Sequence, residues 1–378
     1  MMQRAVEALR FRGVHEMVHI SCDHTEPGWW AAQPDADISQ IADLIQRCLP
    51  ARMSFFYLDP FTVAFKKDTD NRRDILMRRD SRFDETCVVL YDNKYAELSG
   101  QLLKFLSDTG EDIHVHFHHE GLTKTNYPDE RMTKRQCGIH DYVCNQDNLA
   151  ADHERVEFKI ELMQQWIADV TGKKLLPWLA VHGCWSFAGS SDEICQLNDE
   201  VSILVRHGCI GDMSFPAPRR EVDPILKTPF TFKNVPIRRA YDSAEGDARP
   251  IEETGLPPDR FFCWNAGNRV RGYNSSIDSY SESSESNVKR MESDRFWLAE
   301  FLQKDLPVVN GIGLLKTHSH SLHRHYLQGL NNPKPPLERA YRTFLGPLAD
   351  ACENAGISWE WLTVCELMAK LKVFCPTL

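Results

Sequence analysis

Eight of the fifteen histidines lie in two short windows of the chain, residues 112–119 and 316–325. They are His114, His116, His118, His119, His318, His320, His323 and His325. Each window follows an apolar run that is typical of a strand. In a strand, alternate side chains face the same side, so His114, His116 and His118 point together and His119 points away. Two imidazoles at this spacing can bind one divalent ion, so the pattern predicts a metal centre.

An acidic turn follows the first apolar run, 18–22. Asp23 comes directly after this run, and Glu26 follows three residues later. Hydrolysis at a metal centre needs an ion with an open position for water, a carboxylate that takes a proton from this water, and an acid that protonates the leaving group. These parts can be supplied by Asp23, His116, His118 and His318.

Strand-like and helix-like segments alternate along the chain. Apolar runs predict strands at 18–22, 53–58, 86–91, 113–118, 175–181, 308–315 and 359–362. Helical spacing predicts helices at 38–48, 95–106, 155–170, 194–206, 336–354 and 365–371, with Asp37 and Thr363 as caps. This order predicts an α/β fold with a parallel sheet, and about seven or eight strand–helix units suit a (β/α) barrel.

In such a barrel the chemistry gathers at the carboxyl ends of the strands. Asp23, the first histidine window, His182 and His318 all fall at or just beyond a predicted strand end. This coincidence across four separate strands is the strongest physical indication that these residues belong to one site.

Composition limits the classes of protein. The chain has 378 residues, 42% hydrophobic and 26% charged, with a formal net charge of −10, so the electrostatic footprint of a nucleic-acid-binding protein is absent. We find no run of about eighteen apolar residues, which predicts no membrane span. The charged first residues lack the apolar core of an export signal, and the twelve cysteines form no Cys-x-x-Cys pair. We therefore expect a cytoplasmic protein with reduced thiols, and a homo-oligomer is possible.

Two stretches look irregular. Residues 216–258 are rich in Pro, Arg and Asp and read as an insertion or long loop, and 274–290 read as a mobile Ser-rich loop that is either a lid or a linker. We expect the whole chain, 1–378, to form a single domain.

Several motifs spread over most of the chain match one known family. They are 20–28 (ISCDHTEPG), 112–120 (DIHVHFHHE), 181–187 (VHGCWSF), 195–209 with 212–218, 315–320 (LKTHSH) and 359–363 (WEWLT). The stretch 195–209 (CQLNDEVSILVRHGC) followed by 212–218 (DMSFPAP) is the most specific match. At these residues the chain resembles the polysaccharide deacetylase family, the NodB-homology group, as a divergent member.

The resemblance implies a distorted (β/α)₇ barrel, a TIM-like fold, with a metal ion, usually zinc, held by one acidic residue and two histidines. It implies hydrolysis of an acetamido or acetyl ester group on a sugar or polysaccharide precursor. Carried over to this sequence, His116 and one of His118 or His119 would be metal ligands, His318 the catalytic acid, and Asp23 the acidic ligand or the base.

The resemblance also suggests residues that contact the substrate. Trp29 and Trp185 could stack on a sugar ring, and His182 could line the pocket. His320, expected on the same strand face as His318, is the alternative catalytic acid. Arg219 and its neighbour Arg220 are the candidates for an arginine that orients the base.

The acidic motif departs from the family pattern, which has two acids adjacent or one residue apart. Either Asp23 binds the metal and Glu26 is the base, or these roles are reversed, or His24 is itself a ligand. Two other readings stay open: a catalytically inactive carbohydrate-binding barrel, and a hydrolase of another C–N or glycosidic bond. A glycosidase needs two carboxylates, and only Glu26 or Glu120 could be the second.

Overall fold

The structure is a computed structural model of the chain. It describes residues 2–31, 35–48, 52–58, 62–66, 75–78, 86–90, 93–117, 149–182, 187, 199–214, 226, 228–237, 239–264, 302–304, 306–319, 342 and 345–371.

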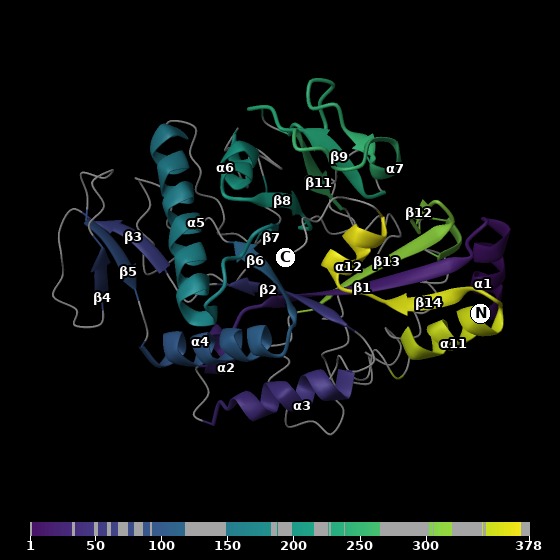
Figure 1. The fold of residues 1–378 in the computed structure, drawn as a ribbon, viewed down its shortest axis with the longest axis horizontal. Coiled ribbons are helices and arrows are strands. Elements are labelled where there is room, and N and C mark those ends of the chain that lie inside the picture. Colours follow the sequence, from purple (N-terminus) through teal and green to yellow (C-terminus); the bar gives the residue numbers. More distant parts are fainter. Residues whose placement is uncertain are drawn as a thin grey trace, which may run out of the picture.

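A large, mostly parallel sheet forms the centre of the molecule (Figure 1). Its parallel strands are β1 (Glu16–Thr25), β2 (Met53–Leu58), β6 (Asp112–Phe117), β7 (Trp178–His182), β8 (Cys209–Asp212), β11 (Arg260–Cys263), β13 (Ile312–Ser319) and β14 (Ser358–Trp361). Antiparallel strands at the two ends are β9 (Phe230–Lys233), β10 (Arg249–Pro250) and β12 (Val308–Val309). The strand order is β10-β9-β11-β8-β7-β6-β2-β1-β13-β12, and β14 pairs with the first half of β1.

This sheet curls into half a barrel, with most of the helices on its convex side. The helices are α1 (Met2–Phe11), α2 (Gly28–Ala31), α3 (Ile38–Cys48), α4 (Asn93–Asp108), α5 (Leu149–Thr171), α6 (Glu200–Arg206), α7 (Ile251–Thr254), α11 (Gly346–Asn354) and α12 (Val364–Lys370). The predicted α/β fold with a parallel sheet is confirmed, whereas seven complete strand–helix units stay a prediction. No helix among the described residues is both long and apolar enough to cross a bilayer.

Two apolar clusters occupy the two faces of the sheet. The outer cluster joins strand residues such as Met17, Val115 and Ala180 to the buried faces of α1, α4, α5, α6 and α11. The inner cluster consists of Val18, Ile20, Cys22, Phe56, Leu179, Val181, Met213, Ile251, Phe262, Trp264, Val309, Leu314, Val364, Leu367 and Met368. Because neighbouring residues of a strand belong to different clusters, each strand residue can be assigned to the inner or the outer face.

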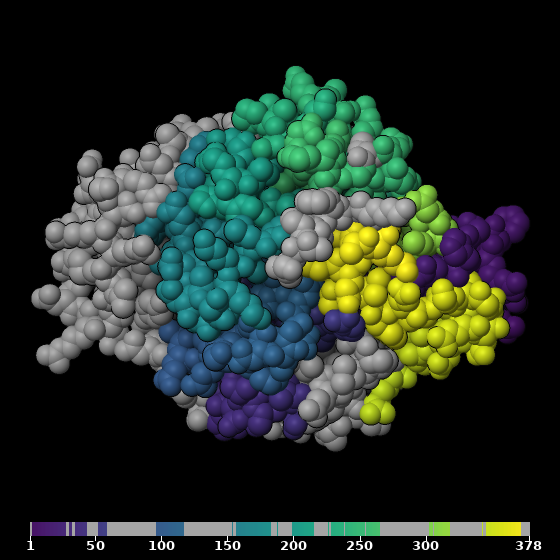
Figure 2. Space-filling model, viewed as in Figure 1, coloured from purple at the N-terminus to yellow at the C-terminus, as the bar shows by residue number. Residues whose placement is uncertain are grey.

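Helix α12 covers the inner face. Its residues Val364, Leu367 and Met368 belong to the inner cluster. The predicted cap is confirmed: Glu366 N–H donates to Thr363 Oγ1, and Thr363 N–H donates to the Glu366 carboxylate at 2.9 Å. This capping box fixes where the helix begins. In the space-filling view the C-terminal segment, yellow, lies against the purple N-terminal segment (Figure 2), where α1 meets α11.

The structure differs from the sequence prediction at two strands. The run 86–91 forms β5 (Thr86–Leu90), which pairs with β3 (Thr62–Lys66) and β4 (Ile75–Arg78) in a separate antiparallel sheet. The run 308–315 is a hairpin of β12 and β13, because Asn310 and Gly311 adopt positive φ angles of 51° and 79°. Asn-Gly is the residue pair that a tight hairpin turn of this kind favours.

The N-terminal residues form α1, which the sequence analysis did not predict. Within 216–258, the described residues form β9, β10 and α7. The Ser-rich loop at 274–290 lies outside the described residues.

Candidate functional site

His116 and Glu26 meet where β6 and β1 end. The Nε2 atom of His116 lies 3.2 Å from a carboxylate oxygen of Glu26, and Nδ1 of the same ring lies 2.9 Å from the main-chain oxygen of Val181. The His116 side chain is 2% exposed and the Glu26 side chain 18%. The imidazole is therefore held in place from one side while the carboxylate reaches the surface.

These contacts determine which ring nitrogen of His116 carries the proton. A carbonyl oxygen can only accept, so Nδ1 must donate to Val181. In the neutral ring Nε2 then carries no proton, and its lone pair faces a carboxylate oxygen of Glu26. Two acceptors at this distance repel each other unless a positive charge lies between them, either a second ring proton or a metal ion.

His24 is the second histidine at this place. It follows Val18, Ile20 and Cys22 in the alternation of β1, so it lies on the inner face. Its ring centre is 5.1 Å from that of His116, with the rings tilted by 31°. The structure thus brings together two inner-face histidines and one carboxylate from two strand ends.

Asp23 follows the opposite alternation. It is fully buried, and one of its oxygens accepts a hydrogen bond from Thr25 Oγ1 at 2.8 Å. Its strand position is on the outer face with Met17. Asp23 and His24 are adjacent in sequence, but they extend from opposite sides of the sheet.

The backbone of His318 lies in β13 beside β1, where it is the registered partner of Cys22. This position places it in the neighbouring strand, close to the end of β1. Trp29 lies in the short helix α2 that follows the acidic turn. His118, His119, Trp185, Arg219, Arg220 and His320 lie outside the described residues.

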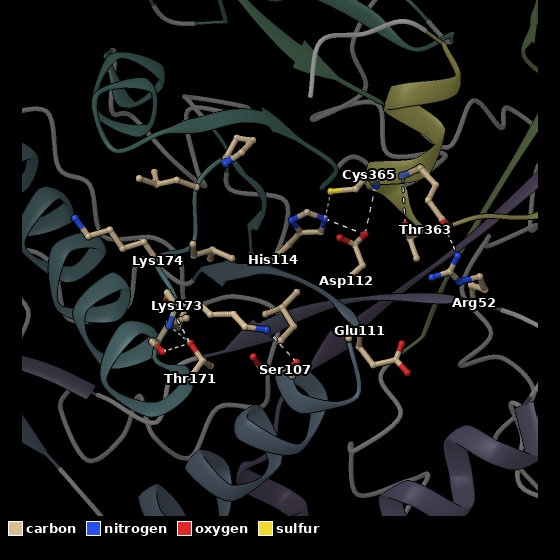
Figure 3. Close-up of a pocket in the computed structure, with 17 residues that line it drawn as sticks. Arg52, Ser107, Glu111, Asp112, His114, Thr171, Lys173, Lys174, Thr363 and Cys365 are labelled. Atoms are coloured by element: carbon tan, nitrogen blue, oxygen red, sulfur yellow. Dashed lines mark hydrogen bonds and ion pairs between the residues drawn. The ribbon is translucent and has the colours of Figure 1, made fainter. Parts of the chain in front are cut away.

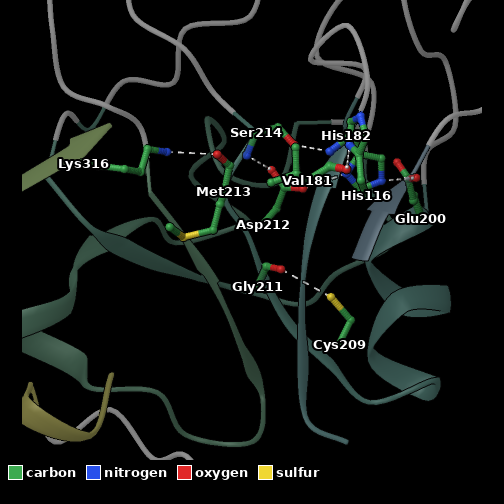
Figure 4. Close-up of polar contacts among 10 residues, drawn as sticks. All are labelled: His116, Val181, His182, Glu200, Cys209, Gly211, Asp212, Met213, Ser214 and Lys316. Carbon is green, nitrogen blue, oxygen red and sulfur yellow. Dashed lines mark hydrogen bonds and ion pairs between the residues drawn. The ribbon is translucent and has the colours of Figure 1, made fainter. Parts of the chain in front are cut away.

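His182 is part of a buried network behind β7 and β8 (Figure 4). Its Nδ1 lies 2.7 Å from the Asp212 carboxylate and its Nε2 lies 2.9 Å from the Glu200 carboxylate of α6. The three side chains are completely buried. Burial disfavours a charged imidazole, but the two carboxylates outweigh it and hold the pKa of His182 well above its ordinary value.

His182 therefore lies on the outer face of the sheet, whereas His116 lies on the inner face. Its neighbours Trp178 and Ala180 belong to the outer cluster, and its partner Glu200 comes from a helix on that side. The network joins two strands to one helix.

Lys316 is a feature that the sequence analysis missed. This buried residue of β13 donates from Nζ to the main-chain oxygens of Met213 and Trp264, both at 2.9 Å (Figure 4). Burial lowers the pKa of Lys316. A lysine inside an apolar strand was the signal that could have revealed it.

Two groups of three metal-ligating side chains occur among the described residues, each with its donor atoms within 4.8 Å of one another. One is Asp112, His114 and Cys365, and the other is the partly exposed group of Glu157, Glu161 and His207. The first lies at the beginning of β6, below the site predicted from the sequence.

No protein-family model matches the chain, and no curated protein matches it in sequence. Among solved structures, the chain is similar to a probable polysaccharide deacetylase from Pseudomonas aeruginosa PAO1, with 10% identity and a TM-score of 0.41 over 95% of this chain and 91% of that one. A likeness at this level does not bear on activity, which rests on the residues themselves.

Proposed function

We propose that this protein is a metal-dependent hydrolase that removes an N- or O-linked acetyl group from a sugar or a polysaccharide precursor. Its metal centre would lie at the carboxyl ends of β1 and β6. The observation that supports this proposal is the contact between His116 and Glu26.

The donor set at this place fits a zinc ion. Zinc accepts imidazole nitrogen and carboxylate oxygen at about 2.0–2.2 Å, which puts neighbouring ligands of a tetrahedral centre about 3.3 Å apart. His116 Nε2 and Glu26 Oε1 are 3.2 Å apart. The backbone acceptor on Nδ1 is the kind of contact that orients a metal-binding histidine. We assign His116 and Glu26 to this centre, with His118 or His119 as a further ligand, and His24, whose ring lies beside that of His116, to its lining.

A bound divalent ion would polarise the acetyl carbonyl and make a water molecule more acidic. Glu26 is partly exposed at the end of β1, so we assign it as the carboxylate that would hold the ion beside this water. Asp23 is buried beside Thr25, so we assign it to shaping the turn that carries His24 and Glu26.

His318 is the acid that we propose for the leaving group. Its backbone lies in the strand next to β1, near the turn that carries the other residues. An imidazole is suited to this step because its ordinary pKa is close to neutral. His320 is the alternative acid, and Trp29, Trp185 and Arg219 stay candidates for substrate contact.

The substrate class rests on the motif resemblance. The His116–Glu26 contact supports a metal centre whatever the substrate, whereas the acetylated sugar is proposed from the resemblance of 195–209 and 212–218 to polysaccharide deacetylases. We expect the protein to act in the cytoplasm, on small or lipid-linked precursors.

The test combines metal analysis with acetate release from N- and O-acetylated sugars. We expect His116→Ala to lose about one zinc ion per chain and to lose acetate release. The exposed His15→Ala should retain both. Wild-type protein without any bound transition metal after reloading would disprove the proposal. Sugar binding without acetate release in metal-loaded protein would instead favour an inactive carbohydrate-binding barrel.

A further inference from the structure

A pocket opens at the opposite ends of the strands, where the main sheet begins. It has a volume of about 320 Å³ and is lined by Arg52 before β2, by Asp112 and His114 of β6, by Pro177 before β7 and by Cys365 of α12 (Figure 3). The proposed function does not use this pocket.

Three chemically different metal ligands converge on its wall. His114 Nε2 lies 3.2 Å from Asp112 Oδ2 and 3.9 Å from Cys365 Sγ. Figure 3 shows the three side chains pointing toward one another, two from β6 and one from α12. An imidazole, a carboxylate and a thiolate form a donor set that a borderline ion such as zinc accepts.

The separations suit one ion. With zinc bonds of about 2.0–2.3 Å, neighbouring ligand atoms of a tetrahedral site lie about 3.3–3.6 Å apart. The two distances from His114 need to change by only a few tenths of an ångström, and the Asp112 and Cys365 ligand atoms lie within 4.8 Å of each other. All three residues line the pocket, so a fourth position would face open space.

The carboxylate of Asp112 is already held in place. Ser54 Oγ donates to Asp112 Oδ2 at 2.7 Å, and the main-chain N–H of Cys365 donates to the same oxygen at 3.4 Å. The carboxylate is therefore oriented beside His114 and Cys365 before an ion binds.

The imidazole needs one rearrangement. Leu179 N–H donates to His114 Nδ1 at 3.3 Å, so the ring proton is on Nε2 in the metal-free protein. Metal binding moves this proton to Nδ1 and gives up the long contact from Leu179. The change gives up two hydrogen bonds, one from Leu179 and one to Asp112, against three bonds to the ion.

We propose that Asp112, His114 and Cys365 form a second metal site of the zinc class, with its open position toward the pocket. This inference is independent of the proposed function. On binding, the Cys365 S–H bond breaks, its proton goes to solvent, and the thiolate binds the ion. The thiol of Cys365 therefore releases one proton for each ion bound. Because His116 needs no tautomer change, this site should bind more weakly than the centre at Glu26.

Cobalt(II) gives a direct test, since a thiolate ligand produces a charge-transfer band in the near ultraviolet. We expect this band in wild type, in His116→Ala and in the control Cys352→Ala, and its loss in Cys365→Ser. Loss of zinc only in His116→Ala would disprove the second site but not the proposed function. Loss of zinc only in Cys365→Ser would disprove the proposed centre at His116 and Glu26 but not the second site.

A second measurement uses the unaltered protein, in case the variant fails to fold. Alkylation of Cys365, followed by peptide mass spectrometry, should slow at least tenfold with zinc and recover with a chelator. An unchanged alkylation rate, or a cobalt band that survives in folded Cys365→Ser, would overturn the proposal.

Discussion

The ammonium nitrogen of Lys316 lies 2.9 Å from the main-chain oxygen of Trp264. These residues belong to β13 and to the end of β11, which are separated in the main sheet by five intervening strands, β8, β7, β6, β2 and β1. A second bond reaches Met213, after β8. One side chain therefore crosses the inner face and connects distant strands of a sheet whose order is open among the described residues.

Removing this cation should destabilise the fold. Lys316→Met keeps the length of the side chain but leaves the buried oxygens of Met213 and Trp264 without their donor, which costs about 1–3 kcal/mol. Urea unfolding measures this loss, with the exposed Lys104→Met as control. Equal stability of the Lys316→Met variant would show that the two oxygens gain other donors.

His182 should make stability depend on pH on the alkaline side. Because its folded pKa is raised, its contribution is fully present below the unfolded pKa of about 6.5 and is lost as pH rises through the folded pKa. His182→Gln should therefore be less stable than wild type by several kcal/mol at pH 6, and by less at pH 9. Denaturation at both pH values checks this, with His15→Gln as the exposed control, and a difference that grows with pH would contradict it.

His19 should make the stability of the fold depend on pH on the acid side. Burial lowers the pKa of His19 from 6.5 to about 3, and its Nε2 lies 2.9 Å from Thr317 Oγ1. A histidine that is kept neutral contributes stability above its unfolded pKa and loses it as pH falls. The loss should be about 2 kcal/mol between pH 7 and pH 5. His19→Gln cannot titrate, so its stability should fall less over this interval, as equilibrium unfolding at each pH will show.

The two acids of the first turn should behave differently. Glu26→Gln removes the charge opposite His116 and should lower zinc affinity and acetate release at least tenfold. Asp23→Asn, a buried position, should lower thermal stability while zinc binding changes little. Zinc titration and thermal unfolding of both variants separate these effects. The reverse result would assign the metal carboxylate to Asp23.

Much of the local structure could be predicted from the sequence. The strands at 53–58 and 112–117 (the second predicted as 113–118), the helix at 38–48 and the cap at Thr363 follow from patterns within a few residues. The shared face of His114 and His116 follows from strand alternation alone. The pair Asn310 and Gly311 is a local signal for a hairpin turn. It was missed because it lies inside the apolar run 308–315, which predicts one continuous strand.

The contacts between distant residues could not be predicted in this way. Cys365 is 253 positions away from Asp112, and no local pattern indicates that α12 meets the start of β6. Glu200 reaches His182 from a helix because β7 and β8 are neighbours. Such pairs depend on the order of strands in the sheet, which a single sequence leaves open.

The position of α12 also affects how the chain is made. Its apolar residues seal the inner face, yet they follow every strand of that face in the sequence. During synthesis, the inner face therefore stays uncovered until α12 has left the ribosome. Until then, Val18, Ile20 and their neighbours are exposed to water, which makes the partly synthesised chain prone to aggregation.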